Sequence, residues 1–261
     1  MKVNNLQSCH LGPEISPEQF ISEHFFLYLL KGSIKAFDGH KHYQMVPGDY
    51  CIARKNHLVR YTKYKDKDEF EKIIITLDEP FLRKFLERHP VQAQADSNND
   101  SFLFIQDNKL IKNYIQSLEP YYSGDLEIDE TFADIKREEL LMIILKSDPA
   151  MANVFFNFAI PAKIDLEAYM NRNFRFNISL ERFAFLTGRS LSSFKRDFQK
   201  VFGTNPGNWL KKKRLDEAYF QISQQKHRPS EVYLEVGFED LSHFSFVFKK
   251  EFGRTPSEVL Q

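Results

Sequence analysis

Apolar residues change their spacing along this chain of 261 residues, from strand-like runs in the first part to helical spacing in the rest. Between about residues 20 and 80, the runs HFFLYLL, which ends near Gly32, and IIITL are apolar over several consecutive positions. A Pro47-Gly48-Asp49 turn separates two further extended pieces. Short strands at this spacing predict a small antiparallel barrel or sandwich.

Helical spacing begins after Glu79-Pro80. The segments PFLRKFLERH and KLIKNYIQSLEPYY predict two helices, and a longer one is expected from Asp129 to Lys146. Residues 91–101 are polar and predict a loop.

Two proline-containing segments, SDPA and AIPAK, interrupt the helical pattern between residues 147 and 163. Because proline ends helices, a hinge is expected between them. The sequence therefore predicts an N-terminal regulatory and dimerisation domain over residues 1–155 and a helical domain over residues 160–261.

The helical C-terminal part contains a segment of sixteen residues that occurs twice. Leu191–Pro206 reads LSSFKRDFQKVFGTNP and Leu241–Pro256 reads LSHFSFVFKKEFGRTP, with eight positions identical. The matched phenylalanines recur every fourth residue, which places them on one face of a helix. Gly203 and Gly253 are expected to stop these helices, and a proline three residues later prevents continuation.

A shorter helix and a glycine turn precede each copy, which is the helix-turn-helix pattern. The helix SLERFAFLT begins at Ser179, a residue type that caps helices, and ends before Gly188. The segment PSEVYLE ends before Gly237, and NPGNWLKKKRLDEAYFQISQ predicts a long spacer helix between the two units. Two units on a stiff spacer are expected to meet two successive major-groove faces of duplex DNA, about 34 Å apart.

A recognition helix needs an apolar face towards its own domain and a polar face towards bases and phosphates. Arg196 could pair with guanine and Gln199 with adenine, while Lys200 and Lys250 are phosphate candidates. The outward residues are Ser192, Ser193, Lys195, Arg196, Gln199 and Lys200 in the first helix, and Leu241, Ser242, His243, Ser245, Phe246, Lys249 and Lys250 in the second.

Some of these residues allow two interpretations. The helix pattern alone also fits a solvated charged face. Phe246 could contact thymine methyl groups or be buried in the core. Residues 211–213, all lysine, are either phosphate contacts or a solvated run, whereas Arg214 is expected to be structural because its charge can pair internally.

Charge is unevenly divided along the chain. Residues 161–261 hold 17 Lys and Arg against 12 Asp and Glu, whereas the whole chain holds 36 of each. A basic C-terminal part fits a polyanionic partner. The start of the sequence, MKVNNLQSCHLGPE, is polar, and no run approaches the roughly 18 apolar residues of a membrane span. Cys9 and Cys51 form no CxxC motif or disulfide framework, so a cytoplasmic protein with reduced thiols is expected.

The last part of the chain resembles the AraC/XylS family of bacterial transcription regulators. The residues that carry the resemblance are Gly237-Phe238, Ser242-His243-Phe244, Phe248-Lys249-Lys250, Gly253-Arg254-Thr255-Pro256, and upstream Ser179-Leu180, Ala184, Gly188, Phe194-Lys195-Arg196, Phe198, Gly203, Arg214, Leu215 and Ala218. Two residues depart from the family pattern: Phe246 stands where a polar or basic residue is frequent, and Tyr233 stands where a small alanine is usual.

The resemblance implies an α+β protein with a cupin-like N-terminal β-barrel, carrying helices, and an all-α domain with two helix-turn-helix units. Leu30 and Gly32, with the turn at residues 47–49, resemble landmarks of the regulatory half. That half is similar to the type III secretion activators, a subgroup switched by partner proteins. The implied partners are double-stranded DNA, RNA polymerase, a second copy of the chain, and a small-molecule effector or a regulatory protein. No cofactor is implied.

Enzyme chemistry has little support in the sequence. His40 and His42 resemble half of a cupin metal site, but no further ligand follows them, so no metal is expected. Cys51 has no neighbouring motif that would activate it and fits a half-buried strand position. No P-loop, GxSxG or HExxH motif occurs. A cupin-type enzyme fused to a DNA-binding domain remains the alternative class.

The segment ADIKREELLMIIL carries apolar residues near helical spacing. These are Ile135, Leu140, Leu141, Ile144 and Leu145. They could pack against their own domain or form a dimer seam.

Overall fold

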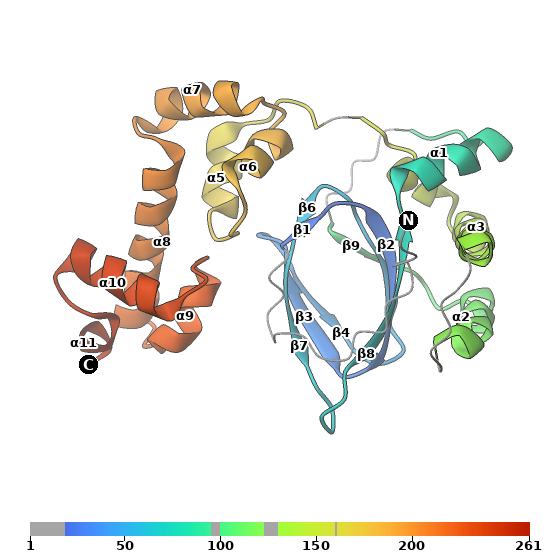
Figure 1. Cartoon of the computed structure of the whole chain (residues 1–261), viewed down its shortest axis with the longest axis horizontal. Helices are drawn as coiled ribbons and strands as arrows, with labels where there is room; N and C mark the ends of the chain where they lie inside the picture. Colours follow the sequence, from blue (N-terminus) through green and yellow to red (C-terminus); the bar gives the residue numbers. More distant parts are fainter. Residues whose placement is uncertain (1–18, 95–99, 123–129, 160) are drawn as a thin grey trace. The chain divides into compact units, whose positions relative to one another are not determined.

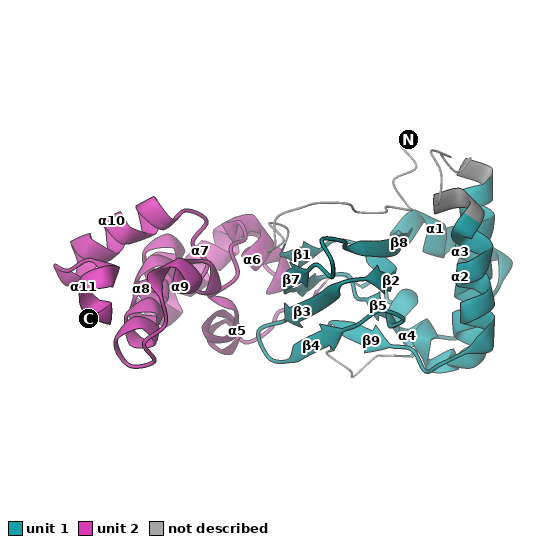
Figure 2. Cartoon of the chain, turned by 90° about the horizontal axis from the view of Figure 1, so that it is seen from below, with its two compact units in different colours: residues 1–159 teal, residues 160–261 magenta. Residues whose placement is uncertain are grey.

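A computed structural model describes residues 19–94, 100–122, 130–159 and 161–261. The chain divides into two compact units, residues 1–159 and residues 160–261 (Figure 2). Cys9 and the polar start of the sequence lie outside the described residues. No helix in the described ranges is long and apolar enough to cross a membrane.

Unit 1 combines nine described strands with helices. The strands are β1 (Phe20–Ile21), β2 (His24–Lys31), β3 (Ser33–Phe37), β4 (His42–Met45), β5 (Tyr50–Ala53), β6 (His57–Leu58), β7 (Arg60–Tyr64), β8 (Glu71–Leu77) and β9 (Phe102–Phe104). The helices are α1 (Glu79–Arg88), α2 (Lys109–Tyr122), α3 (Glu130–Ser147), the short 3-10 helix η1 (Pro149–Met151) and α4 (Ala152–Phe155).

The strands form three antiparallel sheets. Their orders are β8-β2-β5-β9, β4-β3-β7 and β1-β6. The sheets are not joined into a closed barrel among the described residues, so the expected barrel is open, while the α+β class is confirmed. Strands β9 and β4 each end a sheet, and within the described residues they are not paired with each other.

The four-stranded sheet is covered on both faces, which explains why its strands are apolar without alternation. Successive residues of a strand point to opposite faces. Leu27 and Leu29 pack between the sheets, and Phe26 packs on the other side with residues of α1 to α4. Figure 1 shows α1, α2 and α3 on the side of β2 and β8 that faces away from β3 and β7.

Helix α3 packs mainly on its own unit. Leu140, Leu141 and Ile144 are fully buried in the cluster beneath the helices. Ile135 is 55% exposed and belongs to the opposite face. Most of the apolar residues predicted for this helix therefore pack in the core of unit 1, whereas Ile135 faces away from it.

Several smaller expectations need correction. Strand β9 and strand β7 were not predicted, because FLFI and RYTKY are short and carry no strong alternation. The predicted loop 91–101, by contrast, is confirmed over its described residues, 91–94 and 100–101, which contain no helix or strand. Cys51 is completely buried, not half-buried, because both faces of its sheet are covered, and its thiol lies 3.8 Å from the sulfur of Met45.

Unit 2 is helical. Its helices are α5 (Leu166–Asn173), α6 (Leu180–Leu186), α7 (Leu191–Phe202), α8 (Pro206–Ser223), α9 (Pro229–Glu235), α10 (Leu241–Phe252) and α11 (Pro256–Leu260). Helices α6 to α10 fall where the sequence predicts them. Pro206 and Pro256 are the first residues of α8 and α11, where the missing N–H is tolerated. Each proline starts its helix three residues after the glycine that ends the previous one. Helix α11 was not predicted.

Candidate nucleic-acid interface

Helices α7 and α10 begin and end in the same way. Ser190 and Asp240 cap their first turns through side chains that accept hydrogen bonds from Ser193 and His243 backbone N–H groups. Gly203 and Gly253 end them in the left-handed conformation, with φ of 68° and 73°. Glycine adopts this conformation without the steric penalty that a Cβ brings. The sequence repeat is therefore also a structural repeat.

The apolar faces of the two helices are built alike. The ring centroids of Phe194 and Phe198 are 5.5 Å apart, and those of Phe244 and Phe248 are also 5.5 Å apart. All four rings are fully buried. Burial of these rings fixes the rotation of each helix, since a phenylalanine contributes on the order of 2–3 kcal/mol when it leaves water. The opposite face must then point to solvent.

The predicted contact residues lie on those opposite faces. On α7, Lys195, Arg196, Gln199, Lys200 and Ser192 are exposed, and Ser193 is half-buried. On α10, Leu241, Ser242, His243, Phe246, Lys249 and Lys250 are exposed, and Ser245 is half-buried. Each helix thus gathers its predicted residues on one accessible surface, called here the α7 face and the α10 face.

Phe246 is the most exposed large apolar side chain among the described residues, with 68% of its surface accessible. The interpretation of Phe246 as a core residue is therefore wrong. The core positions of α10 are already occupied by Phe244 and Phe248, which are one helical turn apart. Phe246 falls between them in the sequence and so lies on the far side of the helix.

Arg214 is structural, as predicted. Its guanidinium donates hydrogen bonds to the backbone carbonyls of Phe174, Phe176 and Gly237, at 2.8, 2.8 and 3.0 Å. Burial lowers the pKa of Arg214 to about 10, which still leaves it charged at neutral pH. This side chain joins α8 to the segment after α5 and to the turn before α10.

The lysines at the start of α8 differ among themselves. Lys211 and Lys212 are exposed and Lys213 is half-buried. Lys212 lies 3.4 Å from a carboxylate oxygen of Glu251, on α10. Lys213 lies 5.9 Å from the ring centre of Trp209.

One ion-pair network beside α7 was missed in the sequence. Arg189, in the turn before α7, donates from Nε to Asp197 at 3.1 Å and from Nη1 to the carbonyl of Ile164 at 3.0 Å. Lys163 lies 3.2 Å from the same carboxylate. The hydrogen bonds from Lys163 and then Arg189 lower the pKa of Asp197. The network holds α7 against the segment before α5, and no local pattern marks residues so far apart.

His40 and His42 are not joined by further potential metal ligands in the described part of the chain. His40 and His42 are both exposed, and the His42 ring packs on Phe37 with centroids 4.6 Å apart. Within the described ranges, no group of three or more His, Cys, Asp or Glu side chains is placed to hold a metal ion.

Two families match this chain. Residues 24–154 match the family described as the ExsA N-terminal regulatory domain. Residues 183–261 match a helix-turn-helix domain family, which covers the second helix-turn-helix unit and most of the first.

Similar proteins extend along nearly the whole chain. The HTH-type transcriptional regulator ExsA of Pseudomonas aeruginosa is 24% identical over 262 residues, covering 98% of this chain and 92% of that protein. The thermoregulatory protein LcrF of Yersinia pestis is 22% identical over 237 residues, covering 88% of this chain and 86% of that protein. Among solved structures, an apo form of ToxT from Vibrio cholerae has a TM-score of 0.46 at 16% identity, covering 98% of this chain and 96% of that one.

The resemblance based on the repeated segment is therefore confirmed by matches that also include the N-terminal half. The family match there spans half of the chain, and the relatives that extend over both halves are transcriptional regulators. The chain belongs to the AraC/XylS family of transcriptional regulators and carries an N-terminal domain of the ExsA regulatory type.

Proposed function

We propose that unit 2 reads a specific operator by placing the α7 face and the α10 face in two successive major grooves. The observation that carries this proposal is the repeat itself. Two helices that are capped in the same geometry and bury equivalent ring pairs present accessible polar faces, and they are joined by the spacer helix α8. A single helix-turn-helix unit would need only one such face.

The two faces differ in chemistry, which predicts different roles. The α7 face carries Lys195, Arg196 and Gln199, residue types that form hydrogen bonds with base edges and phosphates. The α10 face places the apolar ring of Phe246 among Ser242, His243 and Lys249. The first face is proposed to provide most of the hydrogen-bond readout, and the second to add apolar contact and phosphate anchoring.

The salt dependence of DNA binding tests this proposal. Lysine and arginine contacts to phosphate release counterions, so affinity should fall steeply with salt concentration. Fluorescence anisotropy of the full chain with duplex DNA, at two salt concentrations, measures the slope. An affinity that does not change with salt would contradict the assignment of the α7 and α10 faces to DNA.

Control by unit 1 is proposed to run through a protein partner. The space between the two larger sheets is filled by a cluster that includes Leu29, Met45 and Phe102. A cavity of about 300 Å³ remains beside Phe25, Tyr61 and other residues, at the lower end of the range for ligand pockets. A small effector is the second candidate, and this cavity is the observation in its favour.

A homodimer through α3 completes the proposal. Phe132, Ile135 and Met142 are about half exposed and lie three and seven residues apart, so they share one face of the helix. An apolar stripe of this kind on a helix is a frequent dimer contact. The complex with operator DNA is proposed to act on RNA polymerase in the cytoplasm. No catalytic activity is part of the proposal.

A further inference from the structure

Strand β9 is an edge strand of the four-stranded sheet, and just before it the hydroxyl of Tyr43, on β4, accepts a hydrogen bond from the N–H of Ser101 at 3.1 Å. Strand β9 pairs antiparallel with β5, with Leu103 opposite Ile52, and no other described strand pairs with it. The edge of a sheet presents backbone N–H and C=O groups that can pair with another chain. The chemistry of β9 therefore depends on which of its backbone groups face outwards.

Hydrogen bonds across the β5–β9 pair identify the outward groups. Arg54 N–H donates to the carbonyl of Ser101 at 3.0 Å, and Ile105 N–H donates to the carbonyl of Tyr50 at 3.5 Å. In an antiparallel pair the bonded positions alternate, so Leu103 also faces β5. The backbone groups of Phe102 and Phe104 then point away from β5. No hydrogen bond joins them to another residue in the described part of the chain.

Natural proteins usually protect such edges with charged residues. Strand β7, an edge strand of the other large sheet, follows this rule, because it contains Arg60 and Lys63. Strand β9 has the sequence FLF, without a charge or a proline, and Phe104 is 47% exposed. An apolar edge of this kind is suited to pairing.

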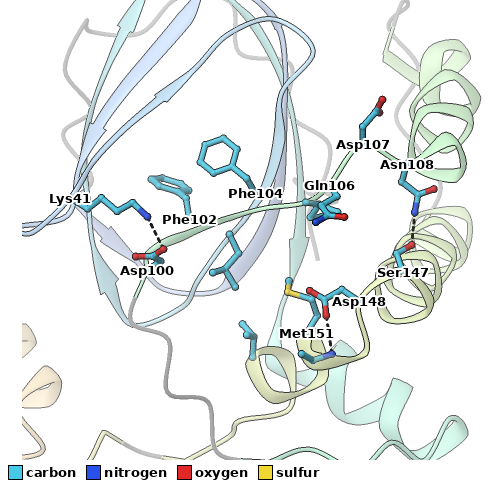
Figure 3. A pocket seen from close by; sticks show the side chains of 14 residues that line it. Lys41, Asp100, Phe102, Phe104, Gln106, Asp107, Asn108, Ser147, Asp148 and Met151 are labelled. Carbon is cyan, nitrogen blue, oxygen red and sulfur yellow. Dashed lines mark hydrogen bonds and ion pairs between the residues drawn. The ribbon is translucent and has the colours of Figure 1, made fainter.

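A groove of about 960 Å³ runs beside this edge. Seven consecutive residues, Phe102 to Asn108, line it, so the groove follows the direction of the chain. Figure 3 shows the rings of Phe102 and Phe104 on one side of the strand and Met151 with Asp148 on the other. The groove thus offers side-chain space on both sides of an added strand, as the alternation of a strand requires.

The charge of the groove indicates the composition of its occupant. Its lining includes Asp100, Asp107 and Asp148 but a single cationic residue, Lys41. Lys41 lies 2.8 Å from Asp100, and Lys112, outside the lining, lies 2.7 Å from Asp107. The lining therefore has an acidic excess, which favours a basic occupant.

We propose that β9 binds an extended segment of a partner protein by strand addition, with apolar residues at alternate positions and basic residues at its ends. The added strand exchanges hydrogen bonds with Phe102 and Phe104, and main-chain bonds of this type give affinity while the flanking space gives specificity. This inference names the partner class for the control of unit 1, and so it rests on the proposed regulator function. Pairing of β9 with the same strand of a second copy is disfavoured, because it would bring two aspartate-rich linings together.

Amide hydrogen exchange of the full chain, resolved by residue with NMR, tests the proposal. The probe is the synthetic peptide Lys-Val-Thr-Val-Thr-Val-Lys, and the control peptide has proline in place of the central valine. At saturation, exchange of the Phe102 and Phe104 amides should slow at least ten-fold (roughly the effect of one new hydrogen bond), while the Leu103 amide, which already faces β5, should not change. The proline peptide should bind at least ten-fold more weakly.

Variants of β9 provide a second test of the proposal. Phe104→Pro removes the outward N–H without removing a bond to β5, and Phe104→Lys adds a charge to the edge if the proline variant fails to fold. Both should weaken peptide binding at least ten-fold. Leu110→Lys changes a residue of α2 with the same 47% exposure and should leave binding as in the wild type.

Three results would overturn the inference: peptide binding that leaves the Phe102 and Phe104 amides unprotected, equal binding of the proline peptide, or protection that grows with protein concentration in the absence of peptide. The last result would assign the edge to a second copy. DNA binding, measured by anisotropy on the same samples, separates the two proposals. Loss of DNA binding contradicts the function of unit 2 and leaves the exchange result of β9 intact.

Discussion

Arg214 Nη1 donates a hydrogen bond to the carbonyl oxygen of Gly237 at 3.0 Å, and this bond ties the spacer helix α8 to the turn of the second helix-turn-helix unit. The same guanidinium holds two carbonyls that follow α5. Three backbone carbonyls thus accept hydrogen bonds from one charged side chain, and hydrogen bonds to charged groups are stronger than those between neutral groups. The contact also fixes how closely the backbone of the turn approaches α8.

The close approach at Gly237 predicts a graded effect of alanine. Gly237 has φ of +98°, and a Cβ there would lie 2.6 Å from the carbonyl oxygen of Arg175. Gly253 has a similar φ of +73° but no atom within 4 Å of its Cβ position. Gly253→Ala should therefore destabilise by about 1–2 kcal/mol, the cost of a left-handed residue alone. Gly237→Ala should lower the free energy of unfolding by clearly more than Gly253→Ala does, as measured by urea unfolding of the full chain. Equal effects of the two variants would mean that the turn at Gly237 can move away from the carbonyl of Arg175 at little cost.

Arg196 and Lys250 should differ in their effect on sequence discrimination. Arg196→Ala is expected to reduce specific binding by roughly 1–3 kcal/mol, the usual contribution of a bidentate base contact, and to leave non-specific binding almost unchanged. Lys250→Ala should weaken both kinds of site about equally, because phosphates carry no sequence information. Titrations with operator and scrambled duplexes compare them. If Arg196→Ala also weakens both sites equally, Arg196 contacts phosphate and not a base.

Phe246 should couple to a thymine methyl group. Since 68% of its surface is accessible, Phe246→Ala should change stability by less than about 0.5 kcal/mol. It should weaken operator binding by roughly 1 kcal/mol, and replacing the contacted thymine by uracil should have little further effect in the variant, since contacting groups are not additive. Phe220→Ala alters another exposed phenylalanine, on α8, and is the control. Additive effects of Phe246→Ala and every thymine replacement would argue against the methyl contact.

The stability of unit 1 should depend on pH through His24. This side chain is 2% exposed, and burial, followed by the nearby charges of Lys55 and Arg54, lowers its pKa to about 3. The unfolded chain takes up the proton near pH 6.5, but the folded chain does not. The contribution of His24 to the free energy of unfolding is therefore fully present above about pH 6.5. It falls by about 1.4 kcal/mol per pH unit as the pH decreases towards the pKa of His24 in the folded chain.

Urea unfolding between pH 7 and pH 5, monitored with a probe in unit 1, measures this effect. Between about pH 6.5 and pH 5, the free energy of unfolding of His24→Gln should fall by about 2 kcal/mol less than that of the wild type. His40→Gln serves as the control for removal of a histidine elsewhere in unit 1. Identical slopes in the wild type and in His24→Gln would show that other groups govern the acid sensitivity.

A charge on the exposed face of α3 should separate the proposed dimer. Ile135→Asp places a carboxylate in the centre of the stripe formed with Phe132 and Met142. Burial of an unpaired charge is unfavourable, so the dissociation constant measured by sedimentation velocity should rise at least ten-fold. Val46→Asp changes an exposed apolar residue at the turn before β5 and should not affect assembly. A monomeric wild type would refute the dimer through α3.

The sequence by itself determined most of unit 2. The i, i+4, i+8 spacing of phenylalanine and the glycine stops are local signals, and each acts within one or two helical turns. Helices α7 and α10 therefore appear where their residues predict them, with the expected polar residues outwards. Arg214 was also recognisable as structural, because its place in the spacer helix gave its charge internal partners.

Only the tertiary structure decided the features that depend on distant residues. The Lys163–Asp197 pair and the division of α3 into a buried and an exposed face follow from packing between distant segments, which no short window of sequence contains. The same holds for β9: its residues FLF carry no signal of their own, and they form an edge because β5, about fifty residues earlier, provides its backbone partners on one side alone. Pairing between strands joins residues that are far apart in the sequence. The register of the strands, the open barrel and the unpaired edge of β9 are therefore set only when the sheet is assembled.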